Sequence, residues 1–374
     1  METLEIALKK FLISVINALH PLKRISPGDL PLSLIKRILI VKQHDQLGDL
    51  LVTTPAIRAV RKRFPGASIA IVVREYTVPL MWENTNVDDI ILFRENLKRW
   101  NWQMLKAFWN QLRSGGGFDC AIVFNSVSRS FSSDLIAALS KATYIVGPNH
   151  IPLEQGMPER VYNVQTLRSR KVQHEAEHYL DIVRQIGVKP DGLEYDLQLT
   201  ADEESEADRI LFDVGVRAGV PWIGVHFGAL NRDKRLPFDK LAKAIEWMKA
   251  HYDCEIMLIV GPNEVRHSNE LMNRFRKREV IPIPLQPLRT SCAVIKKLHL
   301  LLCNDTGTMH IASACKVATV SFHSISDPVQ WKPPHERHIA LRAADKRIGS
   351  ITLEMITTAI QTQLEKLRFK QKEF

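Results

Sequence analysis

Short apolar runs alternate with helical patterns along most of this chain, and this alternation restricts the fold more than any other feature. The first run, Ile38-Leu39-Ile40-Val41, is apolar on both faces, as in a strand buried inside a parallel sheet. A polar turn containing Gly48 follows, and then the helical pattern 55–64. Strands separated by helices predict parallel βαβ units. Open sheets of such units present ligands at the carboxyl ends of their strands.

The expected elements fall into two sets. In the first half we predict strands at 38–41, 68–73, 90–93, 120–124 and 144–146, and helices at 55–64, 101–113, 132–140 and 174–187. The alternation restarts near Asp202, with strands at 222–226, 255–260, 299–303 and 318–322 and helices at 201–214, 238–251, 264–277, 291–297, 308–315 and 351–367. Two such halves predict a two-domain α/β protein with a cleft between the domains.

On this pattern the chain divides into four parts. These are an amphipathic extension and linker at 1–34, a first Rossmann-like domain at 35–200, a second at 201–350, and a C-terminal helix with a basic tail at 351–374.

The extension has apolar residues on one helical face: Leu4, Leu8, Phe11, Leu12, Val15, Ile16 and Leu19. Its apolar part is shorter than the roughly 20 residues that span a bilayer. A signal peptide is disfavoured because the glutamates precede the lysines and no small-x-small cleavage site follows. Two interpretations stay open: an interfacial helix on an anionic leaflet, helped by Lys23 and Arg24, or a helix packed on the neighbouring domain.

Composition limits the class of protein and of partner. Of the 374 residues 45% are hydrophobic and 25% charged, which is typical of a globular protein and not of a membrane-spanning or disordered one. The net charge of +10 favours polyanionic partners. Because the basic residues are scattered and no nucleic-acid motif accompanies them, we expect an anionic membrane or an acidic small substrate and no nucleic acid. The five cysteines form no Cys-x-x-Cys pair, which indicates a reducing compartment and no structural zinc.

The turn after the first apolar run carries the first candidate site residues. Lys42, His44, Asp45 and Asp49 lie at this strand edge. Gly48 has no side chain and leaves the Asp49 carboxylate room to stand clear in a crevice. The alternative is that Gly48-Asp49 forms only a turn.

Two turns in the second half are suited to a phosphate. In the first, Gly228 and Ala229 keep the backbone approachable after the strand 222–226, and Lys234 and Arg235 add positive charge. In the second, Asp305 ends a strand and Thr306-Gly307-Thr308 begins a helix, whose free amides and dipole can bind an anion. The alternative for the second turn is an ordinary helix cap. His310 by itself would more often be a packing residue.

Taken together, three segments resemble the bacterial heptosyltransferases of glycosyltransferase family 9, which have the GT-B fold and build the lipopolysaccharide inner core. The segments are Asp45-Gln46-Leu47-Gly48-Asp49, then His226-Phe227-Gly228-Ala229 with Asp233-Lys234-Arg235-Leu236-Pro237, then Asn304-Asp305-Thr306-Gly307-Thr308-Met309-His310. They occur in the family's order and spacing, and His174-Glu175 with Tyr179-Leu180 is similar to its interdomain stretch. The resemblance covers roughly 36–367.

The resemblance implies two Rossmann-like doubly wound domains facing across a cleft, with a C-terminal helix crossing back to the first. It implies inverting transfer of a heptose from ADP-L-glycero-D-manno-heptose to a hydroxyl of an anionic, lipid-linked inner-core acceptor. Such an enzyme would be cytoplasmic and peripheral on the cytoplasmic face of the inner membrane.

The resemblance also implies roles for single residues. Asp49 would be the general base and Lys234 would neutralise the departing diphosphate. Asp305 would hold sugar hydroxyls, and Glu264 would contact the ribose. The remaining donor-binding positions are Gly228, Thr306, Gly307, Thr308 and His310. We expect no obligatory metal, because Lys234 and a helix N-terminus take that role.

Some positions depart from the family's pattern. Phe227 stands where proline is common, and Ala229-Leu230 where small hydroxylated residues often contact phosphate. The expected diphosphate contacts therefore rest on Gly228, Lys234 and the Thr306 turn. Asp45 is either a second polar contact for the acceptor or a helix cap. Arg129 either holds an acidic acceptor or is a solvated surface arginine.

Other functions compete with this one. The same fold could transfer another nucleotide-activated sugar, epimerise one, or bind nucleotide or lipid without catalysis. The presence of Asp49, Lys234 and Asp305 argues against a non-catalytic relative. A dehydrogenase is disfavoured because no Gly-x-Gly-x-x-Gly follows a strand. The sequence leaves the acceptor open among lipid A-linked Kdo, an earlier heptose and another glycan.

Overall fold

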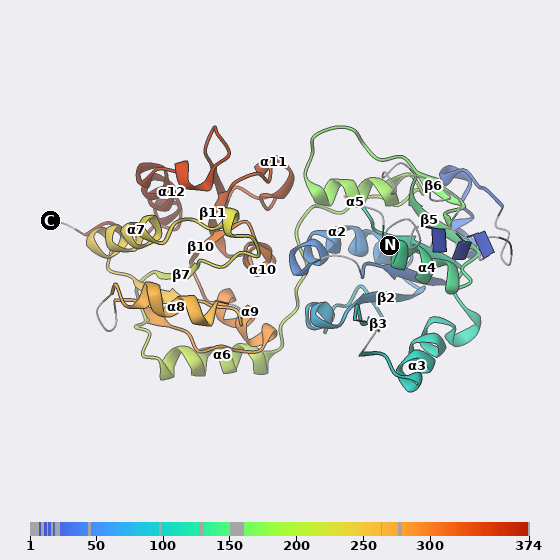
Figure 1. Ribbon diagram of the computed structural model, residues 1–374, viewed down its shortest axis with the longest axis horizontal. Coiled ribbons are helices and arrows are strands. Elements are labelled where there is room, and N and C mark those ends of the chain that lie inside the picture. The colour runs from blue at the N-terminus through green and yellow to red at the C-terminus, as the bar shows by residue number, and fades with distance from the viewer. Residues whose placement is uncertain are drawn as a thin grey trace. The chain divides into compact units, whose positions relative to one another are not determined.

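The computed structural model describes residues 23–43, 46–96, 99–126, 130–149, 161–262, 264–275 and 279–372, with scattered helical positions in 1–22. Contacts divide the chain into a first unit, Met1–Leu193, and a second unit, Glu194–Phe374 (Figure 1). Among the described residues, no helix has both the length and the apolar character needed to cross a membrane.

The first unit is a six-stranded parallel sheet in the order β3-β2-β1-β4-β5-β6. Its strands are β1 (Arg37–Val41), β2 (Ser68–Arg74), β3 (Asp89–Phe93), β4 (Cys120–Val123), β5 (Tyr144–Pro148) and β6 (Val164–Thr166). Its helices are α2 (Leu47–Arg63), α3 (Trp102–Leu112), α4 (Phe131–Leu139) and α5 (Glu175–Arg184). The residues of β1 from Ile38 to Val41 are fully buried, as an apolar run between two layers of helices requires. Helices α2 and α5 lie side by side on the sheet.

The second unit repeats this architecture, with strand order β12-β11-β10-β7-β8-β9. Its strands are β7 (Trp222–His226), β8 (Glu255–Leu258), β9 (Ile281–Pro282), β10 (Leu300–Asn304), β11 (Ala318–His323) and β12 (His338–Arg342). Its helices are α6 (Ala201–Asp213), α7 (Phe238–His251), α8 (Val265–Met272), α9 (Leu288–Lys296), α10 (Gly307–Ala314), α11 (Pro328–Trp331) and α12 (Leu353–Lys366).

The expected pair of doubly wound parallel sheets is confirmed, and each sheet has the Rossmann strand order. In such a sheet the order reverses between two neighbouring strands, and the chain segments that leave them diverge to open a crevice. These switch points are β1/β4 in the first unit and β7/β10 in the second. The carboxyl ends of these four strands are therefore the places to look for a site.

Strands β6, β9 and β12 were not expected from the sequence. All three lie at sheet edges, and β9 has only two residues. Strand β12 begins with His338 and ends with Arg342, and β6 has Gln165 at its centre. An edge strand is covered on fewer sides than a central one, so none of them needs a continuous apolar run to mark it.

Helix α12 packs within the second unit, where the sequence led us to expect a helix that crosses to the first. Ile356, Ile360 and Leu364 are buried in the core of the second unit, and α12 lies beside α7. The apolar face of the helix is thus used on its own sheet.

Helix α2 begins at Leu47, well before the expected start at residue 55, so Gly48 and Asp49 belong to its first turn. Pro55 lies inside the helix and has no N–H for the carbonyl of Leu51. The Thr54 hydroxyl donates to that carbonyl at 2.6 Å and supplies the missing hydrogen bond. The helix therefore continues through a residue that the sequence pattern read as its start.

Candidate active site

In the second unit the candidate residues gather at the β7/β10 switch point. Strands β7 and β10 pair in parallel up to Cys303 and His226, so the segments that follow them leave the sheet side by side. The buried Asn304 side chain joins these segments: its Nδ2 donates to the Phe227 carbonyl at 2.7 Å, and its Oδ1 accepts from the Leu236 N–H at 3.0 Å. One amide thus fixes both ends of the loop that carries Lys234.

Lys234 and Asp305 form an ion pair at this edge. The Lys234 Nζ lies 3.0 Å from the Asp305 Oδ2; the lysine side chain is 35% exposed and the aspartate side chain 8%. Burial alone would raise the pKa of the Asp305 carboxyl, but the neighbouring His323 and Lys234 outweigh burial and lower it. The pair therefore holds an ammonium group at the surface above a buried carboxylate.

Glu264 lies over Gly228 and Gly261, which follow the ends of β7 and β8. A Cβ placed on Gly228 would be 2.6 Å from the Glu264 Oε1, and one on Gly261 would be 2.5 Å from its Oε2. Both distances are shorter than a real Cβ contact, so the Glu264 carboxylate would have to move to make room for a side chain at either position. The structure thus brings Glu264 next to Gly228.

The Thr306 turn begins helix α10. Thr306 is the N-cap residue in an extended conformation, and its hydroxyl is directed back to the Asn304 carbonyl at 3.4 Å. Thr306, Gly307 and Thr308 are partly exposed. The first N–H groups of a helix have no partner within it, so this turn offers donors to an anion beside the Lys234–Asp305 pair.

His310 lies one turn into α10 and is buried. Burial lowers the pKa of its imidazole to about 4, although the charge of Asp305 opposes the shift. Its ring lies 5.8 Å from that of Tyr195, measured between centroids. The histidine is therefore a neutral group at neutral pH, suited to hydrogen bonding and not to charge neutralisation.

In the first unit, Asp49 is held by the start of α2. Its Oδ2 accepts a hydrogen bond from the Gln46 N–H at 3.0 Å, as the third residue of a capping box does. The carboxylate is partly exposed. Asp49 thus lies in the first turn of α2 and not in a loop before the helix, and this turn holds its carboxylate in place.

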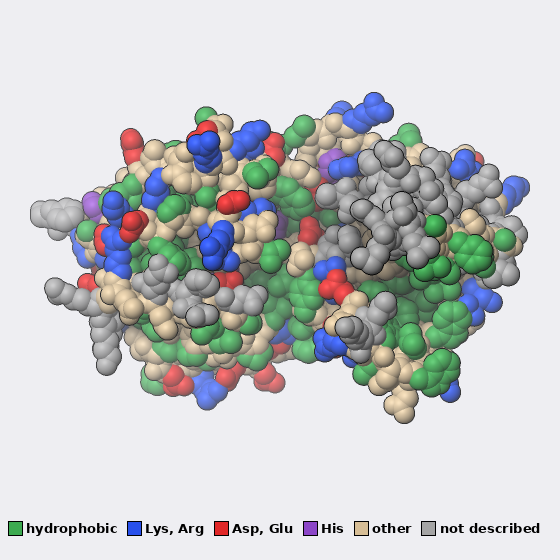
Figure 2. Space-filling view, viewed as in Figure 1, with side chains coloured by type: hydrophobic (Ala, Val, Ile, Leu, Met, Phe, Trp, Pro, Cys, Tyr) green, Lys and Arg blue, Asp and Glu red, His purple; other side chains and the backbone are tan. Residues whose placement is uncertain are grey.

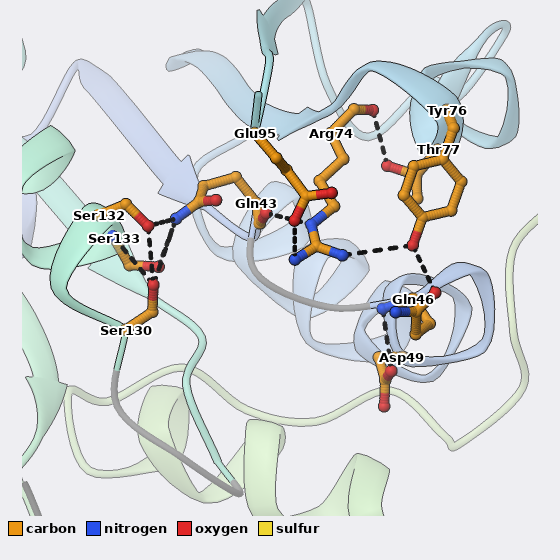
Figure 3. Close-up of polar contacts among 10 residues, drawn as sticks. All are labelled: Gln43, Gln46, Asp49, Arg74, Tyr76, Thr77, Glu95, Ser130, Ser132 and Ser133. Carbon is orange, nitrogen blue, oxygen red and sulfur yellow. Dashed lines mark hydrogen bonds and ion pairs between the residues drawn. The ribbon is translucent and has the colours of Figure 1, made fainter. Parts of the chain in front are cut away.

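A second layer of side chains supports this turn (Figure 3). The Tyr76 hydroxyl donates to the Gln46 Oε1 at 2.7 Å. Arg74, at the end of β2, donates from Nε to the Gln43 carbonyl at 2.9 Å and forms an ion pair with Glu95. Burial raises the pKa of the Tyr76 hydroxyl although Arg74 opposes the shift, and the hydroxyl is protonated and a donor at neutral pH.

Lys42 and Gln43 join β1 to its neighbours. The buried Lys42 Nζ donates to the Phe124 carbonyl at 3.1 Å and to the Tyr179 hydroxyl at 2.7 Å. The Gln43 Nε2 donates to the hydroxyls of Ser132 and Ser133 at 2.9 and 3.0 Å. Both residues therefore hold the β1/β4 switch point together.

A cavity of about 380 Å³ opens at the carboxyl ends of β2 and β3. Its charged and phenolic lining consists of Arg74, Arg94, Arg99, Glu75, Glu95 and Tyr76. Arg94 and Arg99 both pair with Glu75, at 3.1 and 3.0 Å. Three guanidinium groups against two carboxylates leave the lining with an excess of positive charge.

Comparison with known proteins places the chain in a family. The model of "Glycosyltransferase family 9 (heptosyltransferase)" matches residues 105–355. The chain belongs to this family.

Individual relatives agree with that assignment. A putative glycosyltransferase of Haemophilus influenzae is 24% identical over 347 residues, which cover 86% of this chain and 94% of that protein. A crystal structure of a family 9 glycosyl transferase from Veillonella parvula superposes with a TM-score of 0.77 at 21% identity, covering 88% and 97% of the two chains. The ADP-heptose lps heptosyltransferase II of E. coli superposes with a TM-score of 0.70 at 18% identity, covering 89% and 99%.

As a family 9 member this protein is a heptosyltransferase-like glycosyltransferase. Its second unit joins Gly228, Lys234, Glu264 and Asp305 with the turn that starts α10. Such a site provides an ammonium group, two carboxylates and the amides of a helix N-terminus, which are groups able to bind a sugar diphosphate. Asp49 lies in the first unit, at the β1/β4 switch point.

Two predicted acceptor residues, Asp45 and Arg129, lie outside the described residues, as does His44. Their proposed contacts remain predictions.

Arg74, Tyr76 and His323 were not predicted from the sequence as site residues. Arg74 and Tyr76 follow the buried run of β2, so their place at a strand end was a signal for the same sheet edge as Asp49. His323 ends β11, beside the strand that leads to Asp305, and its Nε2 lies 3.0 Å from the Ser321 hydroxyl. A search for polar residues at or directly after the end of a buried strand would have identified all three.

Proposed function

We propose that this glycosyltransferase transfers a heptose from ADP-L-glycero-D-manno-heptose to a hydroxyl of a lipid-linked lipopolysaccharide inner-core acceptor, with inversion at the anomeric carbon. One observation carries the proposal: the Lys234–Asp305 pair beside the N-terminus of α10, at a Rossmann switch point. The family membership and the ADP-heptose enzyme among its structural relatives support the choice of donor.

In this mechanism the donor is bound by the second unit. The diphosphate accepts hydrogen bonds from the amides of Thr306, Gly307 and Thr308 and is neutralised by Lys234. Asp305 accepts hydrogen bonds from sugar hydroxyls, and Glu264 accepts them from the ribose. Because Asp305 already holds the Lys234 ammonium group in place, little reorganisation is needed as negative charge grows on the leaving ADP.

Asp49 acts as the general base. Its carboxylate takes the proton of the acceptor hydroxyl while the acceptor oxygen bonds to the anomeric carbon. The bond from that carbon to the β-phosphate oxygen breaks, and ADP leaves with the electron pair. A single displacement of this kind inverts the anomeric configuration. The Gln46 N–H holds the carboxylate in place through one of its oxygens.

The acceptor is anionic and is held by the first unit. The cavity lined by Arg74, Arg94 and Arg99 lies next to Tyr76, which contacts the same turn as Asp49. Guanidinium groups bind carboxylate and phosphate in two-point contacts. We therefore assign this cavity to an acidic substituent of the acceptor.

The enzyme works at a membrane surface, on the cytoplasmic face of the inner membrane. The net charge of +10 favours an anionic leaflet. In the N-terminal stretch, the described apolar side chains Leu8, Phe11, Leu12 and Val15 are all exposed, as an interfacial segment requires.

The donor is tested by supplying purified enzyme and inner-core oligosaccharide with ADP-heptose or with UDP- and GDP-sugars. Release of the nucleoside diphosphate measures turnover, and NMR of the product gives the anomeric configuration. We expect turnover of ADP-heptose with inversion. Preferential turnover of a UDP- or GDP-sugar would overturn the donor assignment.

The base is tested with Asp49→Asn. The asparagine side-chain oxygen still accepts the Gln46 N–H, so α2 keeps its start while the base is lost. We expect kcat to fall about 10²–10⁴-fold with little change in stability. Asp202→Asn, in the first turn of α6, is the matched control and should leave kcat unchanged. Undiminished transfer by a folded Asp49→Asn protein would show that another group is the base.

A further inference from the structure

Helix α3 has more apolar surface than its packing uses. On its inner side, Phe108 packs edge-on against Trp100, with ring centroids 5.4 Å apart, and lies 6.1 Å from Phe93 of β3. Leu112 is fully buried on the same side. One such row is enough to attach a surface helix to its domain.

A second apolar row points to solvent. Trp102, Leu105 and Trp109 are spaced by three and four residues and share a helix face, and their exposed fractions are 77%, 47% and 39%. Figure 2 shows hydrophobic side chains gathered on the surface over this part of the first unit. A contiguous exposed patch that contains two tryptophans marks an interaction surface.

The edge of this row is basic. Lys106 is exposed and lies on the helix beside the row, and the Arg113 guanidinium carbon lies 3.7 Å from the centroid of the Trp109 ring. Between Glu95 and Asp119 the charged residues of the sequence are all basic: Lys98, Arg99, Lys106 and Arg113.

We propose that α3 docks this enzyme on an anionic lipid bilayer. Trp102, Leu105 and Trp109 enter the boundary between headgroups and acyl chains, where the apolar ring and polar N–H of tryptophan are both accommodated. Lys106 and Arg113 contact the anionic headgroups. A second copy of the chain fits less well, because a two-fold interface through this row would bring the basic edges of both copies together.

Contact between α3 and the bilayer would bring the enzyme to a lipid-linked acceptor. The chain segment that leads into α3 contains Arg94 and Arg99, which line the cavity assigned to the acceptor. Docking through α3 would place a lipid surface beside that cavity. This purpose rests on the proposed lipid-linked acceptor, whereas the docking itself does not.

The docking is tested by cosedimentation of the full chain with phosphatidylcholine vesicles, with or without phosphatidylglycerol. The Trp102→Ser/Trp109→Ser double variant should bind anionic vesicles at least about tenfold more weakly than the unaltered protein. Lys106→Gln should bind about fivefold more weakly to anionic vesicles and unchanged to neutral ones. Phe212→Ser removes an exposed aromatic ring of the second unit and should change nothing. Phe11→Ser reports separately on the N-terminal stretch.

Measurements of sugar transfer distinguish this inference from the proposed function. With delipidated oligosaccharide as acceptor, the double variant should transfer sugar as well as the unaltered protein. With acceptor embedded in vesicles, it should be slower. If no donor supports transfer, the proposed function fails and the vesicle result stands by itself.

Three results would overturn the docking: no binding of the unaltered protein to anionic vesicles, equal binding by the double variant, or vesicle binding lost only with Phe11→Ser. A sedimentation-velocity shift from dimer to monomer in the double variant, with vesicle binding unchanged, would assign the surface to self-association instead.

Discussion

His310 is neutral because it is buried, not because it lacks a charged neighbour. Asp305 would favour the imidazolium form, yet desolvation prevails and lowers the pKa to about 4. Its Nδ1 is buried, without a hydrogen-bond partner among the described residues. The folded protein therefore resists protonation at a position where the unfolded chain does not.

This difference predicts a loss of stability in mild acid. As the pH falls below the unfolded pKa of 6.5, the unfolded chain gains a proton at His310, while the folded protein gains it only near pH 4. From pH 7 to pH 5 this residue should remove about 2 kcal/mol from the free energy of unfolding. Urea denaturation at both pH values should show that His310→Gln loses about that much less than the unaltered protein. An equal loss in both proteins would contradict the assignment.

The sequence placed Lys234 and Asp305 on two loops but did not predict how close their side chains lie. Their 3.0 Å contact arises because β7 and β10 are neighbours in the sheet and Asn304 ties the loops together. The proximity of Glu264 to Gly228 was likewise not predicted, because it depends on the approach of another chain segment.

At the scale of elements, helix α2 departs from the local rule that a proline marks the start of a helix. Because proline is common in the first turn of a helix, the sequence predicts a helix start at Pro55. Pro55 lies inside the helix because the Thr54 hydroxyl replaces its missing N–H at the Leu51 carbonyl. As a consequence, the candidate base Asp49 lies in the first turn of a helix and not in a loop before it.

Because the Thr54 hydroxyl replaces the missing N–H of Pro55, we expect mutations of these two residues to have coupled effects on the free energy of unfolding. Thr54→Val keeps the shape but leaves the buried Leu51 carbonyl without that donor, and should cost about 1–3 kcal/mol of stability. In a Pro55→Ala background the new Ala N–H can serve the carbonyl, so the same change should cost clearly less. Urea denaturation of the four proteins measures the coupling. Additive effects would show that the hydroxyl does not replace the proline N–H.

At the scale of the whole molecule, each unit has its own sheet and its own hydrophobic core. A domain with its own core is able to unfold on its own. Calorimetry should therefore resolve two transitions. Ile57→Ala, in the core of the first unit, should lower one of them, and Ile245→Ala, in the core of the second, the other.

Because we place the donor site in the second unit, a bound nucleotide should stabilise the unfolding transition of that unit. ADP at about 100 times its Kd should stabilise the second unit by about 2.7 kcal/mol. That corresponds to a rise of roughly 5–10 °C in the transition lowered by Ile245→Ala. A single transition lowered by both variants would contradict independent units. A rise confined to the Ile57→Ala transition would contradict the assignment of the donor site.

The sequence by itself determined the two parallel α/β sheets, because a buried strand must be apolar on both faces and a helix must be amphipathic. It also placed polar residues at strand ends, where such sheets bind ligands. Only the tertiary structure decided which ends meet, how far α2 extends, and where α12 packs. Those outcomes depend on contacts between residues distant in sequence, such as Asn304 with Phe227 and Tyr76 with Gln46, which no local pattern records.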